Sequence, residues 1–312
     1  MPDAPAPRGA LLLAFGCIYF IWGSTYLAIR FAVETLPPFL MVAGRCLLAG
    51  SALYAWARLR RGRRAATRRQ WRSAAWTGGL LFVGGQALLS VVERWVDSGL
   101  SALMLATIPV WMILLQIRSQ RPRGRTVAGV ALGLVGVALL VVPRAGGVAA
   151  VEPLGAALLL LAALSWAIGS LASRSAELPA GSVLATSLQL LAGGALAALV
   201  GGLAGELGEL AGAAVSARSL LAFAYLTVFG TLVTFSAYTW LLERCEPAMV
   251  GSYAFVNPVV ALGVGWALGG EALSAGALAA AALIVAGVYL VVTSGTGRRP
   301  ASAAALPAAE NE

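Results

Sequence analysis

Histidine is absent from this chain of 312 residues, and lysine is absent too, so that every basic residue is an arginine. Histidine is the commonest general base and metal ligand in proteins. The cysteines, Cys17, Cys46 and Cys245, lack the close spacing of zinc ligands or of a disulfide framework, and no nucleotide-binding glycine loop is present. These absences argue against an enzyme, and we expect neither a cofactor nor a metal.

Charge is also scarce, because only 11% of the residues are charged while 60% are hydrophobic. A chain of this composition is too apolar for a soluble globule and belongs in a lipid bilayer. A spanning helix needs about 20 mostly apolar residues, and ten such runs can be counted. The first run is long and lacks a clear cleavage site, so we expect it to be retained. The predicted fold is an all-α integral membrane protein with ten transmembrane helices.

The arginines are unevenly distributed along this layout. Many lie between the second and third apolar runs, from Arg58 to Arg72, and more lie between the fourth and fifth, from Arg118 to Arg125. When every second connecting loop is short and rich in arginine, those loops are expected on the cytoplasmic side of the membrane. Nucleic-acid binding is less well supported, because only Trp71 accompanies the first basic stretch as a stacking platform. We therefore predict a bacterial-type inner-membrane protein with both termini cytoplasmic and no nucleic-acid partner.

The two halves of the chain resemble each other. The sequence Leu-Leu-Ala-Gly occurs at 47–50 and again at 190–193, and a Trp stands eight residues before an Arg at 22–30 and again at 166–174. A Glu-Arg pair recurs at 93–94 and 243–244, and a Pro-Val pair recurs at 109–110 and 258–259. An odd number of helices separates the starts of the halves, so the second half is expected to insert upside down. We predict two inverted five-helix repeats, at 10–143 and 154–293, followed by a disordered cytoplasmic tail at 295–312.

A proline lies near the middle of the fourth and ninth apolar runs, at Pro109 and Pro258. Proline cannot donate a backbone hydrogen bond, and its ring crowds the carbonyl four residues back, at Leu105 and Ala254. Both helices are expected to be kinked. Interrupted hydrophobic helices at matching places in two halves point to the binding site of a transporter.

The chain resembles the EamA-type branch of the drug/metabolite transporter superfamily. The resemblance covers residues 10–292 and is carried by Trp22-Gly23-Ser24-Thr25, by Arg45 and by the two prolines. It implies ten helices around a central cavity, with helices one, three, four, six, eight and nine facing the cavity and helices five and ten at the periphery. It also implies metabolite export, with amino acids or related amphipathic compounds as the substrate class.

Several polar and aromatic residues away from the membrane edges are candidates for contact with a small-molecule substrate. A pocket that is mostly apolar with a few placed polar groups suits such a ligand. The same tryptophans could simply be large packing residues, and Asn257 could satisfy carbonyls loosened by the kink at Pro258. The candidates are Trp22, Ser24, Thr25, Tyr26, Gln86, Pro109, Trp111, Trp166, Tyr238, Tyr253, Asn257 and Pro258.

Three charged residues are candidates for ion coupling or an ion pair. Arg45 is the only charge well inside an apolar run, and intramembrane charges are functional candidates by default. It could equally tie its helix to a neighbour. Glu93 and Glu243 end helices three and eight, where the helix dipole disfavours an anion, and either could bind a coupling proton or be an interfacial charge beside Arg94 or Arg244.

The favoured function is a secondary transporter that works by alternating access, with the lipid bilayer and a small-molecule substrate as its partners. A lipid-linked carrier flippase of the same superfamily and a non-transporting membrane sensor are the alternatives. A homodimer is compatible with the sequence, which does not indicate the oligomeric state.

The predicted topology can be tested with a reporter that is active only in the periplasm. Because the arginine-rich loops are expected to be cytoplasmic, a fusion after Glu209 should be active and a fusion after Arg64 should be silent. Activity only from the Arg64 fusion would reverse the topology.

Overall fold

The structure is a computed structural model that describes residues 7–61, 66–116, 124–141, 151–179, 181–242, 245 and 253–294. Within these ranges the secondary structure is entirely helical. Seven helical stretches are long and apolar enough to cross a membrane, and three shorter apolar helices cover 124–140, 256–269 and 275–290. The described part of the chain is therefore that of a multi-pass helical membrane protein.

The helices follow one another with short connections. In chain order they are α1 (Arg8–Gly16), η1 (Cys17–Ile21), α2 (Trp22–Ala32), α3 (Pro38–Arg61), α4 (Arg68–Gly78), η2 (Gly79–Ala87), α5 (Leu88–Val92), α6 (Ser98–Leu105), α7 (Ile108–Gln116), α8 (Gly124–Val141), α9 (Pro153–Ser175), α10 (Ser182–Leu203), α11 (Glu206–Gly212), α12 (Ala217–Tyr225), η3 (Leu226–Val233), α13 (Thr234–Leu242), α15 (Tyr253–Gly269) and α16 (Ala275–Ser294).

Local sequence explains several of these boundaries. Pro38 and Pro153 each occupy the first turn of a helix, where the missing N–H costs nothing. Thr67 and Gln70 form a reciprocal capping box at the start of α4. The short helix α11 lies between the long helices α10 and α12. It begins after Gly205, which adopts a left-handed conformation with φ of 84°.

The two prolines have different effects on their helices. The fourth apolar run divides into α6 and α7 around Ala106 and Thr107, directly before Pro109, so the expected interruption is present. By contrast, α15 continues through Pro258 as one unbroken helix. The expected start of this helix near Ala248 lies outside the described residues.

Three π-helical segments, η1, η2 and η3, interrupt the first, third and eighth long helices. A π-helix widens the turn to an i→i+5 hydrogen bond and is frequent at functional sites. Two of these segments, η2 and η3, lie in helices three and eight, which correspond to each other in the two halves of the sequence. The sequence analysis did not predict these segments.

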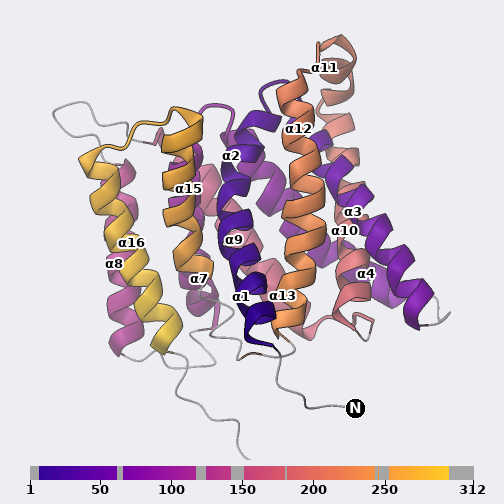
Figure 1. Cartoon of the computed structure of the whole chain (residues 1–312), viewed down its shortest axis with the longest axis horizontal. Helices are drawn as coiled ribbons and strands as arrows, with labels where there is room; N and C mark the ends of the chain where they lie inside the picture. The colour runs from indigo at the N-terminus through magenta and orange to yellow at the C-terminus, as the bar shows by residue number, and fades with distance from the viewer. Residues whose placement is uncertain are drawn as a thin grey trace, which may run out of the picture.

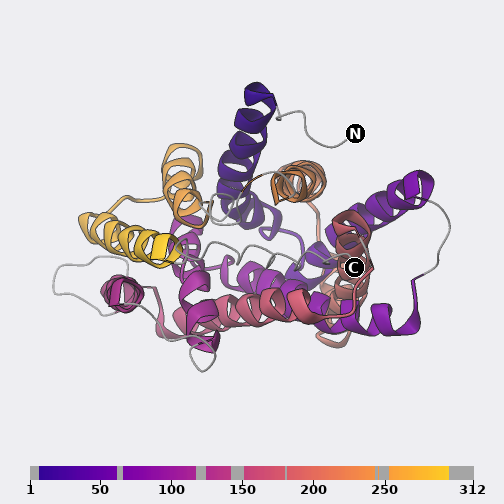
Figure 2. The same ribbon diagram turned by 90° about the horizontal axis from the view of Figure 1, so that it is seen from below.

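The spatial arrangement pairs helices from opposite halves of the chain. At one edge of the bundle α8 packs against α16, and toward the opposite edge α3 packs against α10 (Figure 1). The view turned by 90° again places α8 and α16 beside each other, away from α2 and α12 (Figure 2). Helices five and ten are therefore peripheral, as the resemblance implied.

The contact between α8 and α16 depends on glycine. A Cβ atom on Gly287 would lie 2.6 Å from the Gly129 carbonyl oxygen and 2.7 Å from the Gly133 nitrogen, so a side chain has no room there. Small residues allow such close backbone approach in lipid, where packing rather than water exclusion drives helix association. The glycine spacing of α8 thus has a structural role.

We expect Gly287→Leu to destabilise the protein, because the new side chain would push two backbones apart. Overpacking typically costs about 1 to 3 kcal/mol, which corresponds to a fall in Tm of roughly 2 to 10 °C. The neighbouring Ala286 is exposed on the same helix, so Ala286→Leu is a matched control. Equal Tm values for the two purified variants in detergent would contradict this packing.

Candidate substrate-binding site

Three aromatic rings gather around Trp22 at the start of α2 and form a cluster of four with it. The ring centroid of Trp22 lies 5.0 Å from that of Tyr253, 5.3 Å from that of Tyr238 and 5.5 Å from that of Phe235. Tyr238 and Tyr253 are themselves 6.1 Å apart in an edge arrangement. These residues come from α2, α13 and α15, so the cluster joins the first, eighth and ninth long helices. Three of them were predicted as candidates, and Phe235 was missed.

The indole nitrogen of Trp22 is already used within the protein. It donates a hydrogen bond of 3.0 Å to the carbonyl oxygen of Gly230, which lies in η3. Gly230 permits the close approach, because a Cβ atom there would lie 3.0 Å from the methyl group of Thr25. Trp22 therefore presents its apolar faces, rather than its N–H, to the other rings.

Asn257 bridges two helices instead of satisfying the kink at Pro258. With its amide nitrogen turned toward η1, it donates to the carbonyl oxygens of Ile18 at 3.2 Å and Tyr19 at 3.1 Å. Helix α15 runs close to α2 at this level, since a Cβ atom on Gly23 would lie 2.6 Å from the Val260 side chain. Asn257 is thus a partner for backbone groups of the π-segment η1.

The hydroxyl groups that follow Trp22 are also engaged. Ser24 Oγ donates to the Ile21 carbonyl at 2.9 Å and lies 2.7 Å from the hydroxyl of Tyr225 on α12. Thr25 Oγ1 donates to the Trp22 carbonyl at 2.6 Å, and Tyr26 packs partly buried against the core. In this conformation these groups stabilise α2 and its contact with α12.

Trp166 and Trp111 lie on other helices. Trp166, on α9, packs edge-on against Phe82 of η2 with centroids 6.5 Å apart. Trp111 follows Pro109 on α7, which packs against α9. Its indole nitrogen is buried, and no hydrogen-bond partner is found for it among the described residues. Of the predicted tryptophans, Trp111 therefore has an indole donor left for another ligand.

The predicted charged candidates form a separate group. Arg45 is 5% exposed and donates from a terminal guanidinium nitrogen to Gln86 Oε1 at 2.7 Å, which ties α3 to η2. Glu93 caps the end of α5 and is 1% exposed. Glu243 lies outside the described residues.

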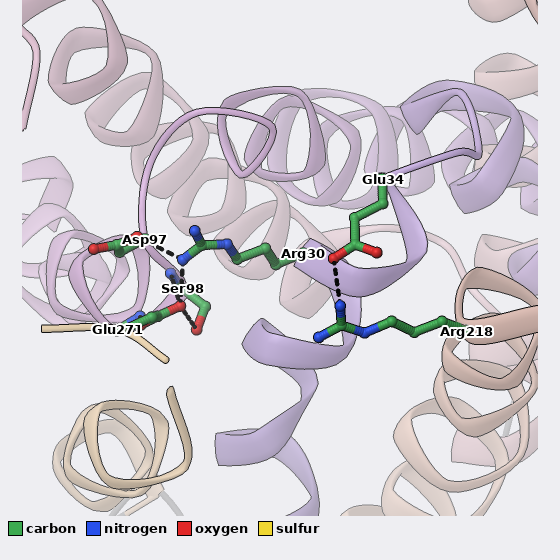
Figure 3. A network of polar contacts seen from close by, with 7 residues as sticks. Arg30, Glu34, Asp97, Ser98, Arg218 and Glu271 are labelled. Atoms are coloured by element: carbon green, nitrogen blue, oxygen red, sulfur yellow. Dashed lines mark hydrogen bonds and ion pairs between the residues drawn. The ribbon is translucent and has the colours of Figure 1, made fainter. Parts of the chain in front are cut away.

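A polar network at the predicted outer end was not found from the sequence. Arg30 Nη1 donates to Asp97 and, at 2.7 Å, to Glu271 Oε1 (Figure 3). Glu271 also accepts hydrogen bonds from the backbone nitrogens of Ser98 at 2.8 Å and Gly99 at 3.0 Å, and thereby caps α6. Asp97 is the N-cap residue of α6, but its own side chain makes no capping bond.

This network joins α2, α6 and the loop between α15 and α16. Burial disfavours the charged form of Glu271, but the hydrogen bonds from Ser98, Gly99 and Arg30 outweigh it and hold the pKa of the carboxyl below its ordinary value. Glu271 is therefore ionised at neutral pH. The signal in the sequence was weak, because Arg30 and Glu271 are far apart along the chain.

The chain matches known proteins along almost its whole length. The profile of the EamA-like transporter family matches it twice, over residues 8–142 and 153–293. The "Uncharacterized inner membrane transporter YedA" of Escherichia coli (strain K12) is 38% identical over 286 residues, which cover 90% of this chain and 91% of the relative. A "Probable amino-acid metabolite efflux pump" of Salmonella typhimurium is 27% identical and covers 91% of this chain and 95% of its own length.

A solved structure titled "Crystal structure of protein" has the same fold. It superposes with a TM-score of 0.63 at 24% sequence identity and covers 91% of this chain and 97% of the solved one.

The polar network generates a stability prediction. Glu271→Gln should lower the Tm in detergent at neutral pH, because a buried carboxylate that accepts charge-assisted bonds contributes on the order of 1.5 to 3 kcal/mol. Glu209, which pairs with Arg94 at the surface, is the matched control. An exposed pair contributes about 0 to 1 kcal/mol, so Glu209→Gln should change the Tm little. Equal shifts would contradict the capping role of Glu271.

Proposed function

We propose, because this chain belongs to the EamA-like transporter family, that it exports small amphipathic metabolites, with amino acids or related compounds as the substrate class. The chain is a multi-pass membrane transporter and not an enzyme. Two relatives are themselves named as probable amino-acid metabolite efflux pumps. The cluster of Trp22, Tyr238 and Tyr253 supports a site for a partly apolar ligand in this chain.

The proposal includes ten spanning helices in two inverted repeats, at 10–143 and 154–293. The cross-half packing of α3 with α10 and of α8 with α16 supports it. So do two equivalent side-chain bonds: Trp22 donates to Gly230 in η3, and Ser165 donates to the Leu80 carbonyl in η2 at 2.8 Å. Each bond connects the first helix of one half to the third helix of the other.

Alternating access would exchange the environments of the two halves around a site between helices one, four, six and nine. Pro109 and Pro258 are proposed to lie near mid-depth at equivalent positions. Trp22, Tyr253 and Tyr238 would form one wall, and Trp111 and Trp166 another. We further propose an inner-membrane location with both termini cytoplasmic, and a homodimer is compatible with this arrangement.

The free donor on Trp111 allows a sharp test of the site. Trp111→Phe removes a buried N–H that has no partner among the described residues, so the variant should be as stable as the parent or more stable. If the indole binds substrate, transport should fall by up to roughly tenfold, because a hydrogen bond contributes about 0.5 to 1.5 kcal/mol. Trp266→Phe is the matched control, since Trp266 on α15 is 60% exposed.

The measurement has two stages. Cells that overproduce the parent or a variant are compared for amino acids in the medium, and the accumulated compound is then used for counterflow in liposomes that contain purified protein. Parent-like counterflow by Trp111→Phe would remove Trp111 from the site. Binding of the accumulated compound without counterflow would favour a sensor. Movement of a lipid-linked carrier in place of a metabolite would favour a flippase. Either outcome would overturn metabolite export.

A further inference from the structure

Glu93 is the most deeply buried charged residue that neither the packing nor the polar network explains. It is 1% exposed, and neither carboxylate oxygen has a hydrogen-bond partner in the part of the chain that the structure describes. It also caps the carboxyl end of α5, where the helix dipole disfavours an anion. A buried carboxylate without partners is strongly disfavoured, and such a group becomes neutral by binding a proton.

In the described part of the chain Arg45 has one nitrogen without a hydrogen-bond acceptor, whereas Glu93 lacks a donor. The terminal nitrogen of Arg45 donates to Gln86 Oε1 at 2.7 Å, but its Nε atom is buried and has no partner among the described residues. Gln86 and Glu93 lie on the same long helix, seven positions and about 10 Å apart along the axis. Arg45 interacts electrostatically with Glu93 from α3. Contact between them would satisfy the Nε atom and a carboxylate oxygen together.

We propose that Glu93 is a proton-binding site whose charge decides whether Arg45 is held by Gln86 or by Glu93. In the described conformation Glu93 is the neutral acid and Arg45 is bonded to Gln86. When the O–H bond of Glu93 breaks, the proton passes to water at the predicted outer end and the carboxylate attracts the guanidinium, which remains protonated throughout. As the coupling site of a transporter, this pair rests on the proposed function.

The surroundings of Glu93 support the neutral form. Burial raises the pKa of its carboxyl well above the ordinary value, and the negative charge of Glu271 raises it further, while Arg30 and Arg45 lower it only in part. Arg30 is committed to Asp97 and Glu271. Tyr26 of α2 also interacts electrostatically with Glu93. On α9, which packs against α5, the charged residue at the near end is Glu152, and it is exposed.

The pH dependence of stability follows from this arrangement. Because the carboxyl of Glu93 has a higher pKa in the folded protein than in the unfolded chain, the folded state binds more protons between those two values. Its contribution to stability is therefore fully present below the unfolded value and is lost as the pH rises through the folded value. Glu93→Gln mimics the neutral acid and should remove this loss.

The direct test is infrared titration of the purified protein without substrate. The parent should show the C=O stretch of a protonated carboxyl that disappears only at a pH well above the ordinary range of glutamate. Glu93→Gln should lack this band, and the control Glu209→Gln, at the exposed pair with Arg94, should keep it. Absence of the band in the parent at neutral pH, or its persistence in Glu93→Gln, would overturn the proposal.

Two further variants test whether Arg45 exchanges Gln86 for Glu93, because they should shift the pKa of Glu93 in opposite directions. Arg45→Gln removes the nearby positive charge and should raise the pKa of Glu93, whereas Gln86→Leu removes the alternative partner of Arg45 and should lower it. We expect each shift to be about one pH unit, a tenfold change in proton affinity. Shifts of the same sign, or none, would overturn the exchange. Because no substrate is present, failure of these titrations is distinct from failure of the transport assay.

Discussion

A backbone carbonyl that loses its helical partner inside a bilayer must be satisfied by another part of the protein. This constraint explains how the interrupted helices of this chain are packed. Trp22 donates to a carbonyl of η3, Ser165 to a carbonyl of η2, and Asn257 to carbonyls of η1. Each widened or disturbed turn thus receives a side-chain donor from a different helix. The bonds that these three side chains make between the halves therefore lie where the helices are least regular.

A related requirement explains two carboxylates at the predicted outer end of the bundle. Glu271 caps the start of α6, and Glu206 accepts bonds from the backbone nitrogens of Phe39 at 3.2 Å and Leu40 at 2.9 Å near the start of α3. Free N–H groups at a helix start need acceptors, and a carboxylate also suits the helix dipole. Helix α11 and the loop after α15, both from the second half, therefore hold the helix starts of the first half at the predicted outer end.

The sequence predicted what depends on local patterns. Long apolar runs indicated the spans, and Pro109 indicated the interruption between α6 and α7, because steric exclusion by proline needs no knowledge of distant residues. The kink at Pro258 stays a prediction, since α15 is one continuous helix through that residue and a kinked helix can be continuous too. The π-segments, the partner of Asn257 and the cap from Glu271 could not be predicted. Each depends on which residue of a remote helix comes within bonding distance, and no local spacing encodes that.

The two halves share a backbone plan but differ at one charge inside the membrane. Where the first half has Arg45, the second has Gln189, whose amide nitrogen donates at 2.8 Å to both Thr77 Oγ1 and Ser173 Oγ. This neutral side chain is satisfied, whereas the Nε atom of Arg45 has no partner in the described part of the chain, and Arg45 interacts electrostatically with Glu93. A ligand shifts a conformational equilibrium only by its different affinities for the two states. A charge such as Arg45, which is present in one half only, allows the two states of an inverted-repeat transporter to differ in proton affinity, while the direction of coupled transport follows the ion and substrate gradients.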